Sequence, residues 1–289
     1  MMQADFDRHK QWWDEKAVNE ETDLADEAIN RALRWREIER CLEGVRTILE
    51  VGGGTVVFSI PLAKRGYDVT YLDLSSGMLE LARSKAEGLP NISFVVGNGA
   101  DLSSFMDSSF DLVLNMDGAI SFSGSMAEAV ILESCRVTRK RLLVTVSHRA
   151  RLLPLVVWAS LQVTGRLLPA VYAMLEAGEW HQDKYPENPL LTKGMTQDYM
   201  PSMKAFLPGE LRGILERAGM QVLRCGGLGT LADFCKEETI KLLLERKDEK
   251  LFEDFLDLCE RFDREILPDG PGTWQRAGLI AVEEKQVLG

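Results

Sequence analysis

Between residues 47 and 147 the chain alternates between short apolar runs and helix-like runs. Five runs rich in Val, Ile and Leu are bounded by turn residues, at 47–51, 68–74, 92–96, 110–116 and 141–147. Such runs are typical of strands buried on both faces of a parallel sheet. Helix-like runs lie between them over 58–66, 75–88 and 125–140, and the first two end at glycine. This order predicts a doubly wound α/β sheet with right-handed crossovers.

Regions of different character surround this alternating segment. Residues 1–44 are acidic and helix-like, and we expect them to form an N-terminal lid segment. Residues 150–205 show no strand-like alternation, and they are predicted to form a helical cap inserted over the carboxyl edge of the sheet on the substrate side. Order resumes with a helix and a strand in 207–227, a charged helical stretch over 231–266 and a last strand in 273–285. The core is therefore assigned to 45–149 and 206–289.

The apolar stretch 152–175 tests whether the chain enters a membrane. Pro154, Gln162, Arg166 and Pro169 interrupt it. A membrane-spanning helix needs about 20 mostly apolar residues with few or no charges. No membrane span is therefore predicted. The stretch is interpreted as buried or lid helices, with a surface for a homodimer and a membrane-surface contact as the alternatives.

The composition of the chain limits which cellular compartment and which kinds of partner are expected. The net charge is −11, which disfavours a basic groove and hence a nucleic-acid partner. The five cysteines are dispersed and form no C-x-x-C pair, so we expect free thiols, no disulfide framework and no metal site. The N-terminus is charged from the start and lacks the apolar core of a signal peptide. These features predict a cytoplasmic protein.

The stretch ILEVGGGTVVFS, residues 48–59, places three glycines directly after the first predicted strand. A phosphate-binding loop would need a Lys-Ser/Thr pair that does not follow Gly54. A dinucleotide fingerprint would need a third glycine where the chain has Val57. The remaining interpretation uses the acid before the glycines, Glu50, because a carboxylate there suits a cationic ligand.

The segment 47–147 resembles the core of the class I S-adenosylmethionine-dependent methyltransferases. ILEVGGGT resembles their first motif, E/D-x-G-x-G, and VTYLDLSSGMLELAR resembles the second, with Asp73 at the end of a strand. FVVGNGADLSSFMDSSFDLVLNMDGAISF resembles the third and fourth, with Asn98-Gly99 where the family has Asp/Asn-Ala. The small-molecule branch, which includes the ubiquinone and menaquinone methyltransferases, is the most similar. One departure is Val56, where the family often has a further glycine.

This resemblance implies a Rossmann-like, seven-stranded, mostly parallel sheet with helices on both faces. It also implies S-adenosylmethionine as cofactor and S-adenosylhomocysteine as product. Glu50 would lie near the methionyl amino group, Asp73 would accept both ribose hydroxyls, and Asn98 with Gly99 would contact the adenine. The remaining implied cofactor contacts are Gly52, Gly53, Gly54, Ser59, Leu74, Met78, Asn115, Met116 and, from an N-terminal aromatic segment that closes over the cofactor, Trp13.

A methyl transfer needs a general base only if the acceptor must lose a proton. Three candidates follow from their places in the chain: His148 after the fifth strand, His181 in the cap and Asp117 after the fourth strand. Each also fits a purely structural role.

Transfer of a methyl group to a small-molecule acceptor is therefore the first functional hypothesis, and the acceptor atom stays open among carbon, nitrogen, oxygen and sulfur. An NAD-dependent oxidoreductase is the alternative enzyme, although Val57 in place of the third glycine counts against it. A non-catalytic protein that uses 152–175 for partner or membrane contact is the third hypothesis.

Overall fold

A seven-stranded mixed sheet forms the centre of the computed structural model, which describes residues 2–16, 27–116, 118–180, 201–273 and 278–285. Its strands are β1 (Thr47–Val51), β2 (Asp68–Asp73), β3 (Ile92–Val96), β4 (Phe110–Asn115), β5 (Thr138–Val146), β8 (Met220–Gly227) and β9 (Leu279–Lys285). The order is β3-β2-β1-β4-β5-β9-β8. The first five strands are parallel, and β9 runs antiparallel to both β5 and β8. The predicted doubly wound, mostly parallel sheet is confirmed.

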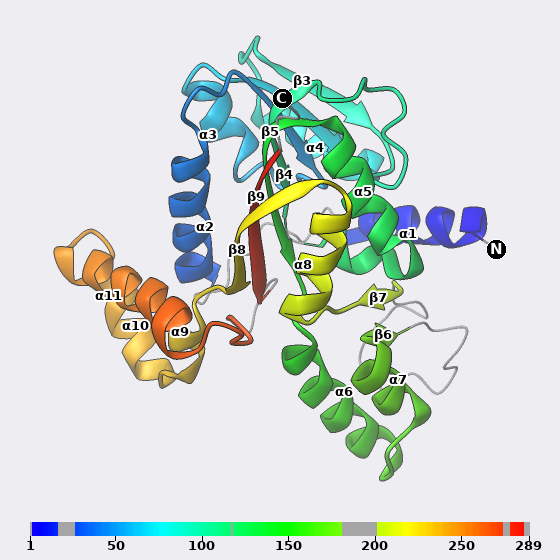
Figure 1. The fold of residues 1–289 in the computed structure, drawn as a ribbon, viewed down its shortest axis with the longest axis vertical. Coiled ribbons are helices and arrows are strands. Elements are labelled where there is room, and N and C mark those ends of the chain that lie inside the picture. Colours follow the sequence, from blue (N-terminus) through cyan, green and yellow to red (C-terminus); the bar gives the residue numbers. More distant parts are fainter. Residues whose placement is uncertain (1, 17–26, 117, 181–200, 274–277, 286–289) are drawn as a thin grey trace.

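Helices cover both faces of the sheet, as predicted (Figure 1). On one face, α2 (Glu27–Cys41) and α3 (Ser59–Lys64) pack in one hydrophobic cluster with β1, β4 and β9. On the other face, α5 (Ala127–Val137) and α8 (Pro208–Arg217) pack in a second cluster. The connection from β2 to β3 contains α4 (Ser76–Lys85), whose Leu79 and Ala82 pack against Tyr71 and Val56.

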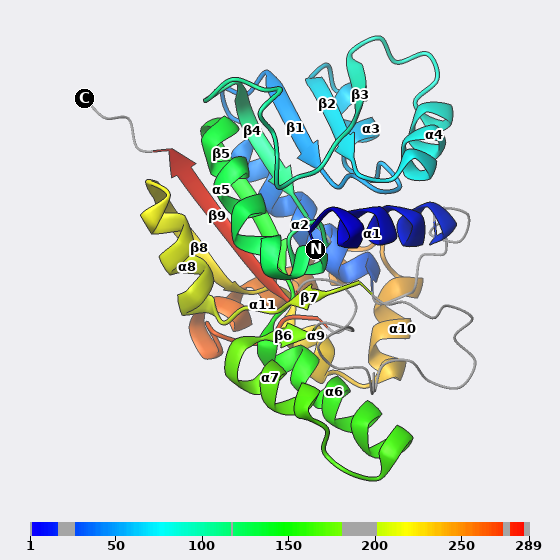
Figure 2. The same ribbon diagram turned by 90° about the vertical axis from the view of Figure 1, so that its right-hand side faces the viewer.

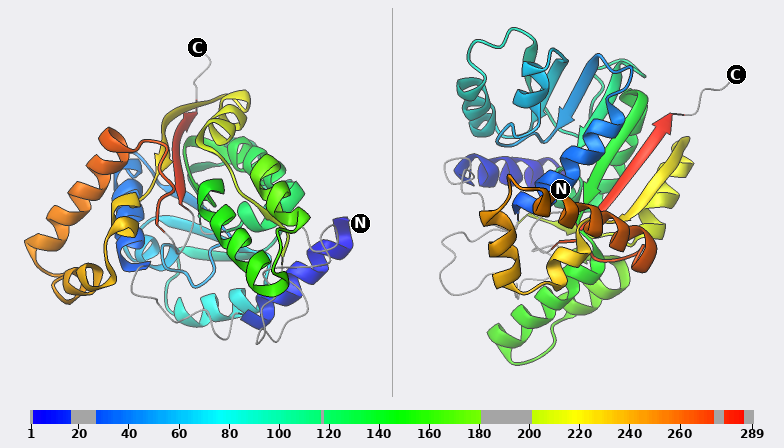
Figure 3. Two further views of the ribbon diagram at one scale, coloured as in Figure 1. Left: turned by 90° about the horizontal axis from the view of Figure 1, so that it is seen from below. Right: turned by 90° about the vertical axis from the view of Figure 1, so that its left-hand side faces the viewer.

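The charged stretch between β8 and β9 folds as three helices and a short turn, α9 (Thr230–Phe234), α10 (Glu237–Glu245), α11 (Lys250–Arg261) and η3 (Phe262–Ile266). These helices lie beside α2 (Figure 3). Arg36 of α2 contacts Glu253 at 2.5 Å and Asp257 at 2.7 Å on α11, and Arg40 contacts Glu260 at 2.8 Å. The ion pairs fix α2 against this C-terminal unit.

The chain between β5 and α8 forms α6 (Arg149–Thr164), α7 (Pro169–Ala177) and two short strands, β6 (Glu179–Trp180) and β7 (Met203–Lys204). These elements lie beyond the carboxyl ends of β1, β4 and β5, and α1 (Met2–Lys16) crosses the same edge (Figure 2). Val156, Met174 and Trp180 form a cluster of their own, while Trp158 and Tyr172 are about half exposed. Among the described residues, none of the helices has the length and apolar character required to span a bilayer.

Two local predictions differ from the structure. The helix expected over 125–140 ends at Val137, and β5 begins at Thr138 rather than at 141. Arg139 and Lys140 hold the buried carboxylate of Asp111 on the neighbouring strand at 2.8 and 3.1 Å, so their charges belong to a strand and not to a helix end. The region 150–205 also contains β6 and β7, which pair with each other.

Candidate active site

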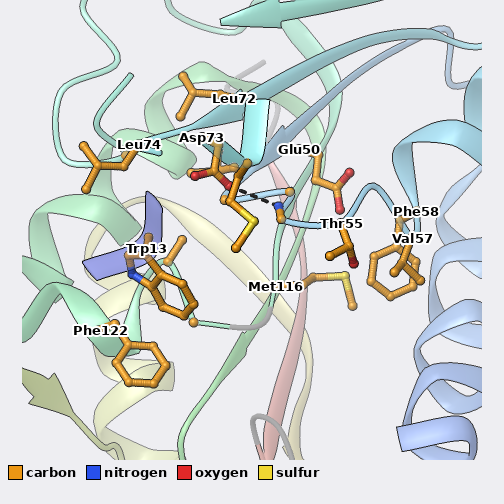
Figure 4. Close-up of a pocket in the computed structure, with 18 of the residues that line it drawn as sticks. Trp13, Glu50, Thr55, Val57, Phe58, Leu72, Asp73, Leu74, Met116 and Phe122 are labelled. Carbon is orange, nitrogen blue, oxygen red and sulfur yellow. Dashed lines mark hydrogen bonds between the residues drawn. The ribbon is translucent and has the colours of Figure 1, made fainter. Parts of the chain in front are cut away.

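A pocket lies at the carboxyl ends of β1, β2 and β4 (Figure 4). Most of the cofactor contacts implied by the sequence line it: Trp13, Glu50, Gly52, Gly53, Gly54, Asp73, Leu74, Met78, Asn98, Gly99 and Met116. They come together because parallel strands end at one edge of the sheet, and the turn after each strand faces the same space.

The turn after β1 requires its glycines. Gly52 has φ +69°, and a Cβ there would lie 2.6 Å from Cβ of Ala119. A side chain on Gly53 would overlap the ring of Tyr71. The Gly52 amide donates a hydrogen bond to the carbonyl of Leu72 at 2.7 Å, which ties the turn to the end of β2. The turn therefore offers bare backbone to the pocket.

Asp73 ends β2 at the pocket wall and is buried. Its carboxylate accepts hydrogen bonds from the amides of Ser75 at 2.9 Å and Gly54 at 3.1 Å. Burial raises the pKa of Asp73, and these two amide donors oppose the rise. The carboxylate is thus held at a fixed position, facing the glycine turn in Figure 4.

Glu50, which precedes the glycine turn on β1, is also held in a fixed position. Its carboxylate accepts a short hydrogen bond from the hydroxyl of Ser59, at the start of α3. Both side chains are buried, but only Glu50 lines the pocket. Ser59, which the family resemblance predicts to contact the cofactor, therefore lies behind Glu50. Asn115 also points away from the pocket, because its amide donates to Ser134 Oγ of α5 at 3.0 Å.

Asn98 lies in the turn after β3 and borders the pocket with Gly97 and Gly99. Its side-chain oxygen accepts a hydrogen bond from the Ala100 amide at 2.9 Å, which shapes the turn. A Cβ on Gly99 would lie 3.0 Å from Val51 and 3.2 Å from Val130. The Ala of the family pattern would therefore be tight at this position.

Aromatic side chains close one end of the pocket. Trp13 of α1 meets Phe122 of η2 (Ser121–Met126) with ring centroids 5.5 Å apart, and both line the pocket. Trp12 is buried, and its ring centroid lies 4.7 Å from that of Trp13. Asp14 on the same helix accepts hydrogen bonds from Ser75 Oγ at 2.6 Å and from the Gly77 amide at 2.9 Å. It thereby anchors α1 to the start of α4.

Of the three candidate bases, His148 alone lies among the described residues. His148 precedes α6, where its Nδ1 accepts a hydrogen bond from the Ala150 amide at 3.0 Å, and it does not line the pocket. Burial lowers its pKa, against the opposing effect of the Asp269 backbone. His181 and Asp117 lie outside the described residues.

Several lining residues were not predicted from the sequence. The first group lies on the N-terminal helices: His9, Asn30, Arg31 and Arg34. The second follows the glycine turn or β4: Thr55, Val57, Phe58, Gly118, Ala119, Phe122 and Ser123. The only sequence signal for the first group is the helical spacing of Asn30, Arg31 and Arg34, which places them near one another without showing what they face.

The match to known families falls on the segment that builds this pocket. Residues 48–141 match the model of the family described as a methyltransferase domain. They contain the glycine turn, Asp73 and Asn98. The chain carries a class I S-adenosylmethionine-dependent methyltransferase domain.

Relatives of this domain act on chemically different acceptors, as their names state. A demethylmenaquinone methyltransferase of Renibacterium salmoninarum is 35% identical over 30% of this chain and 36% of its own. A tRNA 5-carboxymethoxyuridine methyltransferase of Escherichia coli (strain K12) is 29% identical, again over 30% of this chain and 36% of its own. The chain thus spans little more than a third of the length of these relatives.

The fold likeness extends further than the sequence likeness. The crystal structure of a SAM-dependent methyltransferase from Methanosarcina mazei superposes with a TM-score of 0.53, covering 87% of this chain and 97% of that one at 19% identity. The sheet around the methyltransferase domain is therefore shared with a solved structure, including parts beyond residue 148.

Proposed function

We propose that this protein transfers the methyl group of S-adenosylmethionine to a small-molecule acceptor. The observation that carries the proposal is Asp73, a buried carboxylate at the end of β2 that faces the glycine turn inside the pocket. A carboxylate there can accept both hydroxyls of a ribose through charge-assisted hydrogen bonds. The match of residues 48–141 to a methyltransferase domain separates this cofactor from other ribose-containing ligands.

The residues present fit the cofactor. The glycines at 52–54 leave room for a ligand against bare backbone, and Asn98 lies in the next turn along the sheet edge, where an adenine would extend from Asp73. Glu50 and Met116 lie on the opposite side of Asp73 along that edge. We assign the methionyl amino group to Glu50 and the neighbourhood of the methyl group to Met116.

The bound cofactor supplies a methyl group activated by a sulfonium. The transfer would join the acceptor atom to the methyl carbon and release the sulfur as the neutral thioether of S-adenosylhomocysteine. A proton carried by the acceptor would pass to solvent. The protein has to hold the acceptor in line and exclude water. Trp13 and Phe122 are placed to exclude water and to hold the sulfonium, because their rings close the pocket and an aromatic face attracts a cation. His148 is not assigned the role of general base, because its ring caps the start of α6 and does not line the pocket.

The two segments outside the core are assigned to closure and selectivity. We propose residues 1–44 as the lid, since α1 and α2 contribute Trp13 and Arg34 to the pocket. We propose 150–205 as the cap that selects the acceptor. Phe122 supports this, because it lines the pocket and also packs against the cluster of α6 and α7.

A small molecule is favoured over a nucleic acid as the acceptor. The net charge of −11 opposes the approach of a polyanion, although one relative is a tRNA methyltransferase. The proposal predicts that S-adenosylmethionine with a radiolabelled methyl group passes its label to a low-molecular-weight cell fraction. Asp73→Asn should reduce this transfer roughly 10-fold or more at a cofactor concentration below saturation. Label in purified tRNA would overturn the acceptor class, and no label in small-molecule, tRNA or protein fractions would contradict the transfer itself.

A further inference from the structure

Helices α6 and α7 pack against each other as a hairpin, and the turn that joins them lies at one end of the molecule (Figure 1). The hairpin tip, residues 158–172, exposes large apolar side chains at that end. They are Trp158, Leu161, Leu167 and Tyr172, with exposed fractions of 54, 44, 46 and 50%. Together they present roughly 300–400 Å² of apolar surface. A patch of this size on a protein surface is often functional.

The polar groups of the hairpin tip face inward. Ser160 is fully buried, and its hydroxyl donates to the Arg166 carbonyl at 2.7 Å and accepts from the Leu168 amide at 2.8 Å. The Thr164 hydroxyl donates to the Ser160 carbonyl at 2.8 Å. The turn therefore satisfies these backbone groups without water, while its apolar side chains are exposed. This arrangement suits surroundings that contain little water, because unpaired backbone groups are costly there.

The charge of the hairpin also differs from that of the whole chain. The sequence has 45 acidic residues and a net charge of −11, but it has no Asp or Glu between Glu133 and Glu176. Arg166 is the one charged residue within 152–175. The acidic residues are thus kept away from the hairpin tip, so that no carboxylate on it would repel a surface of lipid phosphates.

We propose that the hairpin tip inserts into the headgroup region of a lipid bilayer and holds the protein at the membrane surface. Trp and Tyr prefer this region because one end of each side chain is apolar and the other is polar. Arginine can place its guanidinium among the phosphates while its methylene groups lie in the apolar layer. The contact is interfacial, and none of the helices that the structure describes would cross the bilayer. This inference goes beyond the proposed function and does not rest on it.

A second copy of the chain is the other occupant to consider for this surface. A stable interface buries about 800 Å² on each partner, which is about twice the apolar surface of the hairpin tip. The tip is also a protruding end and not a broad face (Figure 2), so two tips could meet only over a small area. A bilayer has no such restriction, because lipids rearrange around an inserted segment. The membrane surface is therefore the occupant that these features favour.

The test is co-flotation of the full chain with vesicles of phosphatidylcholine that contain a minor share of phosphatidylglycerol. The wild type should float with the vesicles, and added salt should not release it, because the attraction is apolar. Leu161→Ser combined with Leu167→Ser should lower the partition coefficient roughly 10- to 100-fold, since two half-exposed leucines lose their apolar surface. Trp158→Ser should lower it roughly 10-fold, and it carries the test if the double variant does not fold by circular dichroism.

The matched control is Leu251→Ser combined with Leu258→Ser on α11, where the two side chains are 37 and 53% exposed. This helix lies on another side of the molecule (Figure 3), so the partition coefficient should change by less than about twofold. A wild type that does not float would overturn the proposal, as would equal losses in the tip and control variants. Sedimentation velocity without vesicles tests the second copy. A dimer that dissociates in the tip variant, together with no flotation of the wild type, would assign the surface to that copy and overturn the membrane contact.

Discussion

At the residue scale, Val56 occupies a backbone conformation that its side chain disfavours. Its φ is +62°, in the left-handed region that β-branched residues rarely adopt. The side chain is 2% exposed and packs with Tyr71, Leu79 and Ala82. Strain of this kind costs about 1–3 kcal/mol, and burial of a valine contributes about the same amount in the opposite direction. The departure from the family's glycine is thus stabilised by packing.

Val56→Gly should therefore change the free energy of unfolding by less than about 1 kcal/mol, because relief of strain offsets the lost burial. The control is Val113→Gly in β4, where the valine is fully buried in a regular strand and the loss should be roughly 3 kcal/mol or more. Urea denaturation of both variants measures this difference. Equal losses would show that the strain at Val56 has little energetic weight.

Glu283 is a second residue in an unusual environment. It lies on β9, is fully buried, and neither of its carboxyl oxygens has a hydrogen-bond partner among the described residues. Burial raises its pKa well above the ordinary value, so the folded protein holds a proton that the unfolded chain releases. The free energy of unfolding should therefore fall as pH rises from the unfolded pKa toward the folded one.

In that interval the free energy of unfolding of the wild type should fall by about 1.4 kcal/mol per pH unit relative to that of Glu283→Gln. The glutamine keeps the shape of the side chain and cannot ionise. Urea denaturation from pH 5 to pH 8 gives the slopes. Glu284→Gln, at the partly exposed neighbouring position, is the control and should keep the wild-type slope. Parallel profiles for the wild type and Glu283→Gln would contradict a protonated Glu283.

At the element scale, α1 is attached to the core through contacts that sequence patterns do not reveal. Asp14 binds the start of α4, and the Trp12, Trp13 and Phe122 rings join α1 to η2. Asp14→Asn should loosen the helix, because the charge that interacts with the N-terminal end of α4 is lost. Hydrogen exchange over 2–16 should speed up several-fold, and Asp7→Asn at an exposed position of α1 should leave it unchanged. Equal protection from hydrogen exchange in both variants would show that Asp14 does not hold α1 against the core.

The elements that could be predicted from the sequence are those that local patterns determine. The strands expected at 47–51 and 92–96 coincide with β1 and β3. The start of β5 was missed because Arg139 and Lys140 resemble the basic end of a helix, whereas they bind Asp111 across the sheet. Contacts between strands that are distant in sequence decide such boundaries, and a pattern within one strand does not contain them.

The same distinction applies to the site at the scale of the whole molecule. The glycines, Asp73 and Asn98 were predictable because strand ends of a parallel sheet converge. Arg31 and Arg34 were not, since their place depends on how α2 packs between the sheet and α11. His148 was expected near the site as a residue following β5, but its ring turns to cap α6. Sequence thus predicts one wall of the pocket, and the packing of helices supplies the other.

The most direct test of the cofactor cleft is the affinity for S-adenosylhomocysteine of the wild type, Asp73→Asn and Asp68→Asn by titration calorimetry. Asp68 begins the strand that Asp73 ends, and it pairs with Arg46 at the surface, so it is a control on the same element. Binding by the wild type and Asp68→Asn, with a loss of roughly 10-fold or more in Asp73→Asn, is the predicted result. Full affinity in Asp73→Asn, or no binding by the folded wild type, would contradict the account.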